Sequence, residues 1–168
     1  MKKVLIAFIA LFTVVLAENA YAQKLGHINS AELIEVMPER AKITSDLEAY
    51  AKQLETQMNT MMTEYQSKTT EYQTNEQVWT DIVKRAKLQD ITGLEKRIQE
   101  FQQTAQQSLA DREKELATPL LDKAQKAIKD VANANGYTYV FDTSSGTILH
   151  YPDGDDILPL VKKHLGIQ

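Results

Sequence analysis

The 168-residue sequence has no cysteine, only three histidines, and few glycines, prolines and aromatic residues. Without cysteine there is no disulfide framework, no thiolate ligand for zinc and no thiol nucleophile. His27, His150 and His164 are scattered, so a histidine-rich metal centre is not expected. The chain also lacks a basic excess, because its formal charge is −4, and this argues against a nucleic-acid-binding protein. The length fits one or at most two small domains.

Catalytic motifs are missing as well. The sequence has no G-x-S-x-G, no glycine-rich phosphate loop and no histidine spaced to pair with a carboxylate. The DGDD run at residues 153–156 resembles part of a calcium loop, but His164 stands where such a loop needs a bidentate Glu. We therefore expect a turn in which Asp156 caps a final helix, with no metal, no cofactor and no enzymatic activity.

The longest apolar run opens the chain. Two lysines precede residues 4–17, a run too short to cross ~30 Å of hydrocarbon as a helix. An A-x-A motif ends at Ala22, so residues 1–22 are predicted to be a secretory signal peptide, cleaved between Ala22 and Gln23. The alternative is an uncleaved membrane anchor. Cleavage would leave 146 residues with a formal charge of −5, outside the cytoplasm.

A long helical segment fills the middle of the chain. Between Pro38 and Gly136 the sequence is rich in Gln, Glu, Lys, Ala and Leu, which are good helix formers. Apolar residues recur at steps of three and four with an eleven-residue repeat, which predicts one narrow apolar stripe on each helix. A narrow stripe satisfies one partner helix, so residues 41–131 are predicted to form an antiparallel helical hairpin.

The turn of this hairpin is predicted near residues 75–82. VWTD at residues 78–81 suits a turn, with Thr80 capping the second helix, whereas Gly93 is a rival position that would leave unequal arms. Pro119 lies in the second helix, where a kink is expected because proline cannot donate to residue 115.

Residues 23–40 and 132–168 are predicted to form one β-rich oligomerisation body. Strands are expected at residues 24–29, 137–142 and 147–151, the last two joined as a hairpin, followed by a final helix. Three short strands cannot bury a self-sufficient core and leave open sheet edges, so oligomerisation is expected. The fold class is thus α+β, mostly α: a long antiparallel helical hairpin on a small body formed by both termini.

Two groups of side chains are candidates for binding. Flexible thioethers and aromatic rings suit loose contact with varied apolar chains, although most of them could simply fill the hairpin seam. These candidates are Met58, Met61, Met62, Tyr65, Tyr72, Val78 and Trp79. A cationic group beyond the turn could contact anionic lipid or acidic segments of a partner, or be an ordinary solvated helix face. Its members are Lys84, Arg85, Lys87, Lys96 and Arg97.

Three stretches carry a resemblance to a known family: KLGHINSAELIEVMPE, KELATPLLDKAQKAIKDVANANGYTYVFD and ILHYPDGDDILPLVKKHLG. In order and content they resemble the Skp/OmpH family of periplasmic chaperones, and the match covers essentially the whole mature chain. The resemblance implies a jellyfish-like homotrimer, in which strands of three subunits form the body and three helical hairpins surround a cavity.

The same resemblance implies a function without ATP. Unfolded outer-membrane β-barrel proteins would be held in the cavity, kept from aggregating and delivered for membrane assembly. It also implies contact with lipopolysaccharide, but the best-known members are strongly basic whereas this chain is acidic, so only the cationic group near the turn could support such contact. The alternatives are a structural coiled-coil envelope scaffold or a periplasmic adaptor.

Overall fold

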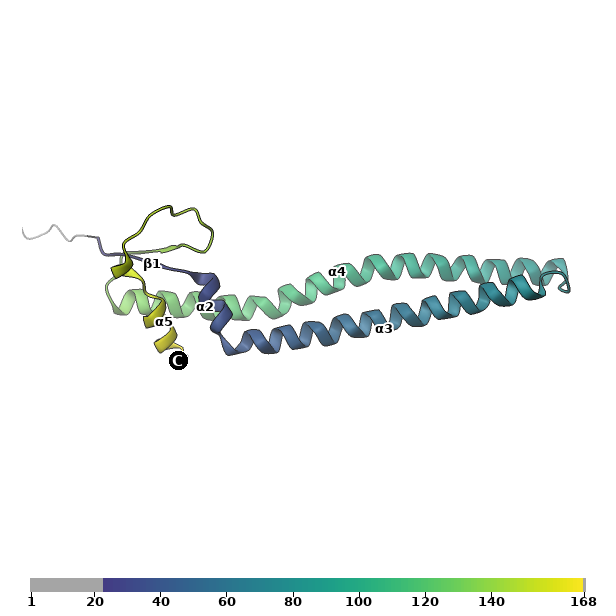
Figure 1. Ribbon diagram of the computed structural model, residues 1–168, viewed down its shortest axis with the longest axis horizontal. Helices are drawn as coiled ribbons and strands as arrows, with labels where there is room; N and C mark the ends of the chain where they lie inside the picture. The colour runs from purple at the N-terminus through teal and green to yellow at the C-terminus, as the bar shows by residue number, and fades with distance from the viewer. Residues whose placement is uncertain (1–22, 168) are drawn as a thin grey trace, which may run out of the picture. The chain divides into compact units, whose positions relative to one another are not determined.

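The computed structural model describes residues 23–167 (Figure 1). The predicted signal peptide, residues 1–22, lies outside the described residues. The chain divides into two compact units. We call residues 34–125 the arm unit, and the described parts of residues 1–33 and 126–168 the terminal unit. The prediction of a mostly helical chain is confirmed, since two long helices account for most of the described residues.

The arm unit consists mainly of α3 (Pro38–Asn75) and most of α4 (Asp81–Ala134), which lie side by side (Figure 1). Tyr50 hydrogen-bonds Ser108 and Glu71 pairs with Lys87, so the two helices run antiparallel. Residues 76–80 form the turn between them. Gly93 lies inside α4, because its neighbours continue the helical hydrogen bonding through it.

Local sequence explains where these helices begin. Pro38 stands in the first turn of α3, where its missing N–H costs no hydrogen bond. Thr80 precedes α4, and its Oγ1 accepts from the N–H of Val83 at 3.5 Å while its carbonyl accepts from Lys84. Pro119 lies inside α4 without ending it.

The seam between the arm helices is thinly packed. No residue of α3 is buried, and its apolar side chains are only half-buried. In the part of α4 that belongs to the arm unit, the buried residues are Leu94 at 1%, Leu120 at 7% and Ala124 at 4% exposure. Because each helix offers a narrow stripe to one partner, water reaches both sides of the seam.

Leu94 has the lowest exposed fraction in the arm unit and should therefore contribute strongly to the local stability of the arm. Leu94→Ala is expected to lower the free energy of unfolding by about 2–4 kcal/mol, because it removes a fully buried side chain and leaves a cavity. Leu88→Ala, at an exposed position of the same helix, is the matched control and should cost under about 1 kcal/mol. Urea unfolding followed by circular dichroism at one protein concentration measures both, and equal costs would contradict this reading.

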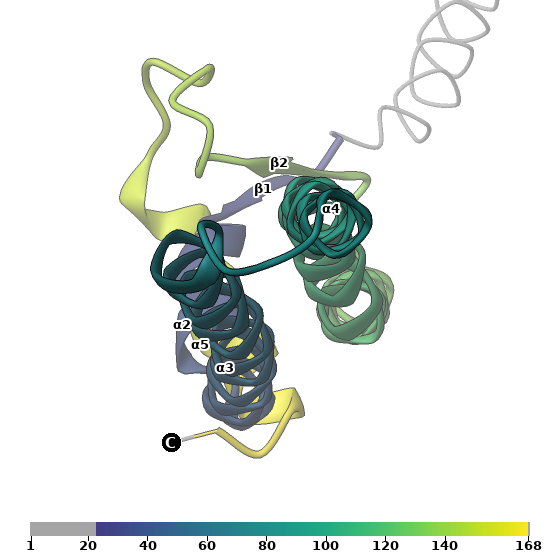
Figure 2. The same ribbon diagram turned by 90° about the vertical axis from the view of Figure 1, so that its right-hand side faces the viewer.

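The terminal unit is built on two parallel strands. β1 (Leu25–Ile28) pairs with β2 (Tyr139–Asp142) in the register Leu25 to Tyr139 through Ile28 to Asp142, and Figure 2 shows them side by side. A parallel pair needs a long connection, and here that connection contains the whole arm. Around the strands lie the start of α2 (Ser30–Val36), the end of α4, η1 (Asp153–Asp155) and α5 (Leu158–His164).

The core of the terminal unit draws on elements from both ends of the chain. Its buried residues include Ile28, Leu33, Val131, Ile157 and Val161. Two helices end beside it in the same way: Gly136 after α4 and Gly166 after α5 both have φ of +71°. In each case the glycine N–H and the following N–H return to the last-turn carbonyls, which is the Schellman motif.

The predicted strand at residues 147–151 is wrong. These residues have no regular structure, so the hairpin with residues 137–142 does not form. Their β-prone sequence finds no partner strand within residues 23–167, and Leu149 is left 94% exposed. The unit is consequently a mixture of helices with two short strands rather than β-rich.

Asp142 joins the end of β2 to the start of α2. Its carboxylate accepts hydrogen bonds from the Ser30 hydroxyl at 2.6 Å and from the backbone N–H groups of Ser30 and Ser144. Burial raises the pKa of Asp142, but these hydrogen bonds outweigh it, so the pKa lies below its usual 3.8. Asp142 is far from α2 in the sequence, yet its carboxylate accepts from the N–H of Ser30, the first residue of α2, which has no partner within the helix.

Asp142→Ala is expected to lower the stability of the protein by about 1–2 kcal/mol, as loss of a helix cap does. Because the folded-state pKa is depressed, the ionised group stabilises above about pH 4 and this contribution disappears as the pH falls further. Thermal unfolding from pH 3 to pH 7 measures both effects. Asp153→Ala, at an exposed acid without a side-chain hydrogen bond among the described residues, is the control, and an equal loss there would refute the cap.

Candidate functional site

The described residues offer no obvious centre for chemistry. Within residues 23–167 no cluster of three metal-ligating side chains occurs, and no helix there has the length and apolarity to cross a bilayer. What these residues do offer is apolar surface on long helices. The candidate site is therefore a set of contact surfaces.

The methionine and tyrosine candidates lie along α3. Met58, Met61, Tyr65 and Tyr72 are half-buried, so part of each stays open to solvent, and Met62 is 39% exposed. The structure thus leaves every one of them partly accessible along α3. This arrangement lets them contact a second chain without unfolding the arm.

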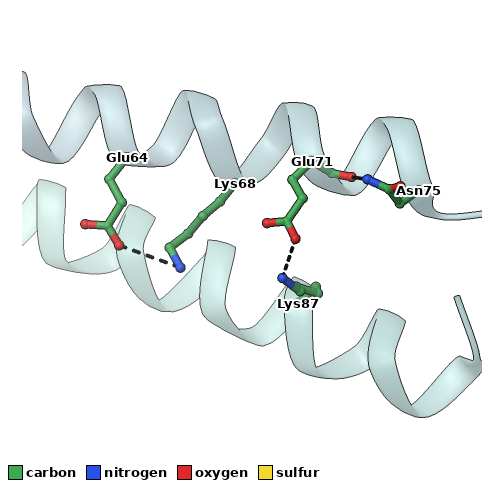
Figure 3. Close-up of polar contacts among 5 residues, drawn as sticks. All are labelled: Glu64, Lys68, Glu71, Asn75 and Lys87. Atoms are coloured by element: carbon green, nitrogen blue, oxygen red, sulfur yellow. Dashed lines mark hydrogen bonds and ion pairs between the residues drawn. The ribbon is translucent and has the colours of Figure 1, made fainter.

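Trp79 is held in place at the turn. Its ring meets that of Tyr72 edge-on at 6.0 Å between centroids, and the Lys87 ammonium lies 5.2 Å from the indole centroid. Lys87 also pairs with Glu71 at 2.6 Å across the two helices (Figure 3). The same view shows Asn75 donating to the carbonyl of Glu71, and Lys68 facing Glu64 at 3.7 Å. Polar contacts therefore fix the last turns of α3 to the start of α4.

Two of the five cationic candidates are paired with carboxylates. Lys87 is paired with Glu71, and Lys96 faces Glu100 at 3.6 Å. No ion pair among residues 23–167 involves the other three, Lys84, Arg85 and Arg97. Both paired carboxylates, Glu71 and Glu100, lie outside residues 84–97, which the cationic candidates span.

Two features escaped the sequence analysis. Ile82, Val83 and Leu88 are exposed on α4 near the turn. In the terminal unit, a largely apolar cavity of about 300 Å³ lies against β1 and the segment before η1. There the buried His27 shares a hydrogen bond with the Pro152 carbonyl at 2.9 Å and packs on Tyr151. Runs of β-branched residues beside a turn are the signal that could have revealed the first feature.

Lys87→Gln tests the fixed turn. The change removes an interhelical ion pair and the cation above the only tryptophan, so it should cost about 0.5–1 kcal/mol and shift the emission of Trp79 to longer wavelength. Lys96→Gln removes an exposed pair within one helix and should change neither quantity measurably. Urea unfolding and fluorescence spectra read out both variants, and an unchanged Trp79 spectrum in Lys87→Gln would contradict the contact.

An exposed helical contact surface without a reactive centre is typical of proteins that bind other macromolecules. The family model described as "Outer membrane protein (OmpH-like)" matches residues 24–165. The chain belongs to this family, and the resemblance read from its terminal stretches is confirmed.

One curated relative adds to this assignment. The chain is 27% identical over 125 residues to the chaperone protein Skp of Vibrio cholerae serotype O1 (strain ATCC 39315 / El Tor Inaba N16961). The alignment covers 74% of this chain and 73% of the relative, so it extends over most of both proteins.

Proposed function

We propose that this protein is a periplasmic holdase chaperone for unfolded outer-membrane β-barrel proteins, acting without ATP and without enzymatic chemistry. Membership of the OmpH-like family and similarity to a relative named as a chaperone support this function. The observation that carries it is the stripe on α3, where no apolar side chain is buried and every candidate contact residue remains partly accessible.

Partial exposure suits a holdase. A half-buried methionine gains only part of its full burial energy from a bound chain, so each contact is weak. Many weak contacts hold an apolar segment without trapping it, and flexible thioethers adapt to different sequences. Release then needs no input of chemical energy, because each contact breaks by itself.

The active form is proposed to be a homotrimer whose arms enclose the client in a cavity. The outer edge of β2 has no partner strand among the described residues, the outer edge of β1 has only an isolated bridge between His27 and Asp156, and the exposed side chains nearby are those of Tyr139, Phe141 and Leu149. Pairing with neighbouring subunits would cover this surface and protect the edges. Secretion behind a cleaved signal peptide would place the trimer in the periplasm, where clients pass on their way to membrane assembly.

The contact residues proposed for clients are the methionines and tyrosines of α3, together with Val78 and Trp79 at the turn. A structural envelope scaffold remains the alternative, since a helical hairpin could also serve as a spacer. Capture from envelope extract separates the two: many unfolded barrel proteins indicate a chaperone, and one fixed stoichiometric partner indicates a scaffold.

The holdase assay uses a denatured porin diluted into buffer. The mature protein, at one trimer per porin and without nucleotide, is expected to suppress light scattering, and sedimentation equilibrium of the same sample should give a trimer. No suppression at any ratio, or a stable folded monomer, would reject the proposal.

A double variant locates the contact surface. Met58→Gln with Met62→Gln should weaken client binding by about tenfold, because roughly 1.4 kcal/mol of apolar burial is lost. Gln57→Asn, at an exposed polar position of the same helix, is the control and should bind as the parent protein does.

A further inference from the structure

Asn135 and Gly136 stand where α4 ends, and together they have the chemistry of a spontaneous modification site. Asn135 is the first residue after the helix, and its side chain is exposed. Gly136 has no Cβ, and apart from its chain neighbours no atom lies within 4 Å of the place where a Cβ would be. Because little crowds the Gly136 nitrogen, it can attack the Asn135 side chain once the chain is free to move.

The reaction needs no cofactor and no oxidant. The Gly136 backbone nitrogen gives its proton to solvent and bonds to the carbonyl carbon of the Asn135 side chain, Cγ, while the side-chain nitrogen takes up a proton and leaves as ammonia. Water then opens the resulting succinimide ring at either carbonyl. The product is aspartate, or isoaspartate with the main chain running through the side-chain carbon. Both products carry a carboxylate in place of the neutral amide.

The folded protein holds both reacting groups. The Asn135 side-chain amide donates to the Val131 carbonyl at 2.8 Å, back along α4. The Gly136 N–H donates to the Asn133 carbonyl at 3.3 Å, as the Schellman motif requires. Both groups have to give up these hydrogen bonds before the ring closes, so the end of α4 has to open first.

A residue close to β1 secures the same helix end. The Lys24 ammonium donates to the Asn135 backbone carbonyl at 2.9 Å and lies 4.0 Å from the centroid of the Tyr137 ring. The backbone carbonyl of Lys24 accepts from the N–H of Thr138 at 2.7 Å. Opening at Asn135 therefore has to disturb contacts between segments more than a hundred residues apart in the sequence.

We propose that Asn135 is a site of spontaneous deamidation that the folded terminal unit suppresses. Its rate follows the fraction of time for which the end of α4 is open. A molecule that reacts while open acquires an isoaspartate, whose additional main-chain carbon displaces the Gly136 N–H from its acceptor. The modification thus marks molecules whose terminal unit has opened and hinders its closure afterwards.

Peptide mapping by mass spectrometry tests the site. The mature protein is incubated in mildly alkaline buffer, either folded or unfolded in guanidinium chloride, and conversion of each amide to a carboxylate is followed over time. Asn135 is expected to react about tenfold or more slowly in the folded protein, because the reaction waits for local opening. Equal rates in the folded and the unfolded protein would overturn the proposal.

Asn133 is a control within the same peptide. It is exposed on the last turn of α4 and is followed by Ala134, whose Cβ hinders the same attack. In the unfolded chain it should react more slowly than Asn135. Equal rates at the two positions would show that Gly136 does not create the site and would also overturn the proposal.

Lys24→Ala tests the contact with the other segment. The change removes the ammonium from the Asn135 carbonyl, so Asn135 should react several-fold faster in the folded protein. The matched control is Lys129→Ala, at an exposed lysine of α4 that forms no ion pair within residues 23–167. It should leave the rate unchanged, and equal rates in the two variants would overturn the role of Lys24.

Asn135→Gln separates the modification from unfolding itself. Glutamine would have to close a larger ring, so this variant should remain unmodified during the same incubation. After return to native buffer, the parent protein should unfold at a lower temperature than parent protein that was unfolded only briefly, whereas the variant should show no such difference. An unchanged midpoint in extensively modified parent protein, or an equal decrease in the variant, would overturn the proposed effect on closure.

Discussion

The structure depends on how little apolar surface each long helix offers. The stripe on α3 is wide enough to pack on one neighbour and too narrow to be enclosed, so no residue of that helix is buried. The arm therefore needs other restraints, and they occur at intervals: Leu94 as a fully buried side chain, Tyr50 with Ser108, and Glu71 with Lys87. A wider stripe would have produced a compact bundle with a closed core, and it would have left nothing for a client to contact.

Local signals in the sequence were enough to place most helix ends. Glycine 136 and glycine 166 adopt a conformation that residues with a Cβ rarely take, and Thr80 has a side chain that caps a helix, so each acts within a few residues of itself. Patterns that depend on distant partners were less informative. Residues 147–151 have a β-prone composition, yet a strand also needs a neighbour with free backbone groups, and composition says nothing about where that neighbour is.

The same distinction explains the candidate site. Lys87 is one of the five cationic candidates, and it pairs with Glu71 on the other helix. Only the folded hairpin brings those two positions together. The exposure of Ile82 likewise depends on where the second helix begins relative to the first, which its neighbours in the sequence do not reveal.

Gly26 shows how closely side chains of the terminal unit pack against β1. A Cβ at this position would lie 2.8 Å from the Tyr137 ring and 3.3 Å from Ile157, so only glycine lets that ring lie against β1. Tyr137 directly follows Gly136, in the turn that ends α4. The ammonium of Lys24 lies 4.0 Å from the centroid of the Tyr137 ring. Residues 24–26 and Tyr137 therefore meet in a close contact within the terminal unit that leaves no space for a Cβ at position 26. A closely packed terminal unit and a loosely packed arm suit each other, because α3 has no buried residue of its own. The close packing of the terminal unit helps to hold the fold while the arm helices stay accessible to solvent.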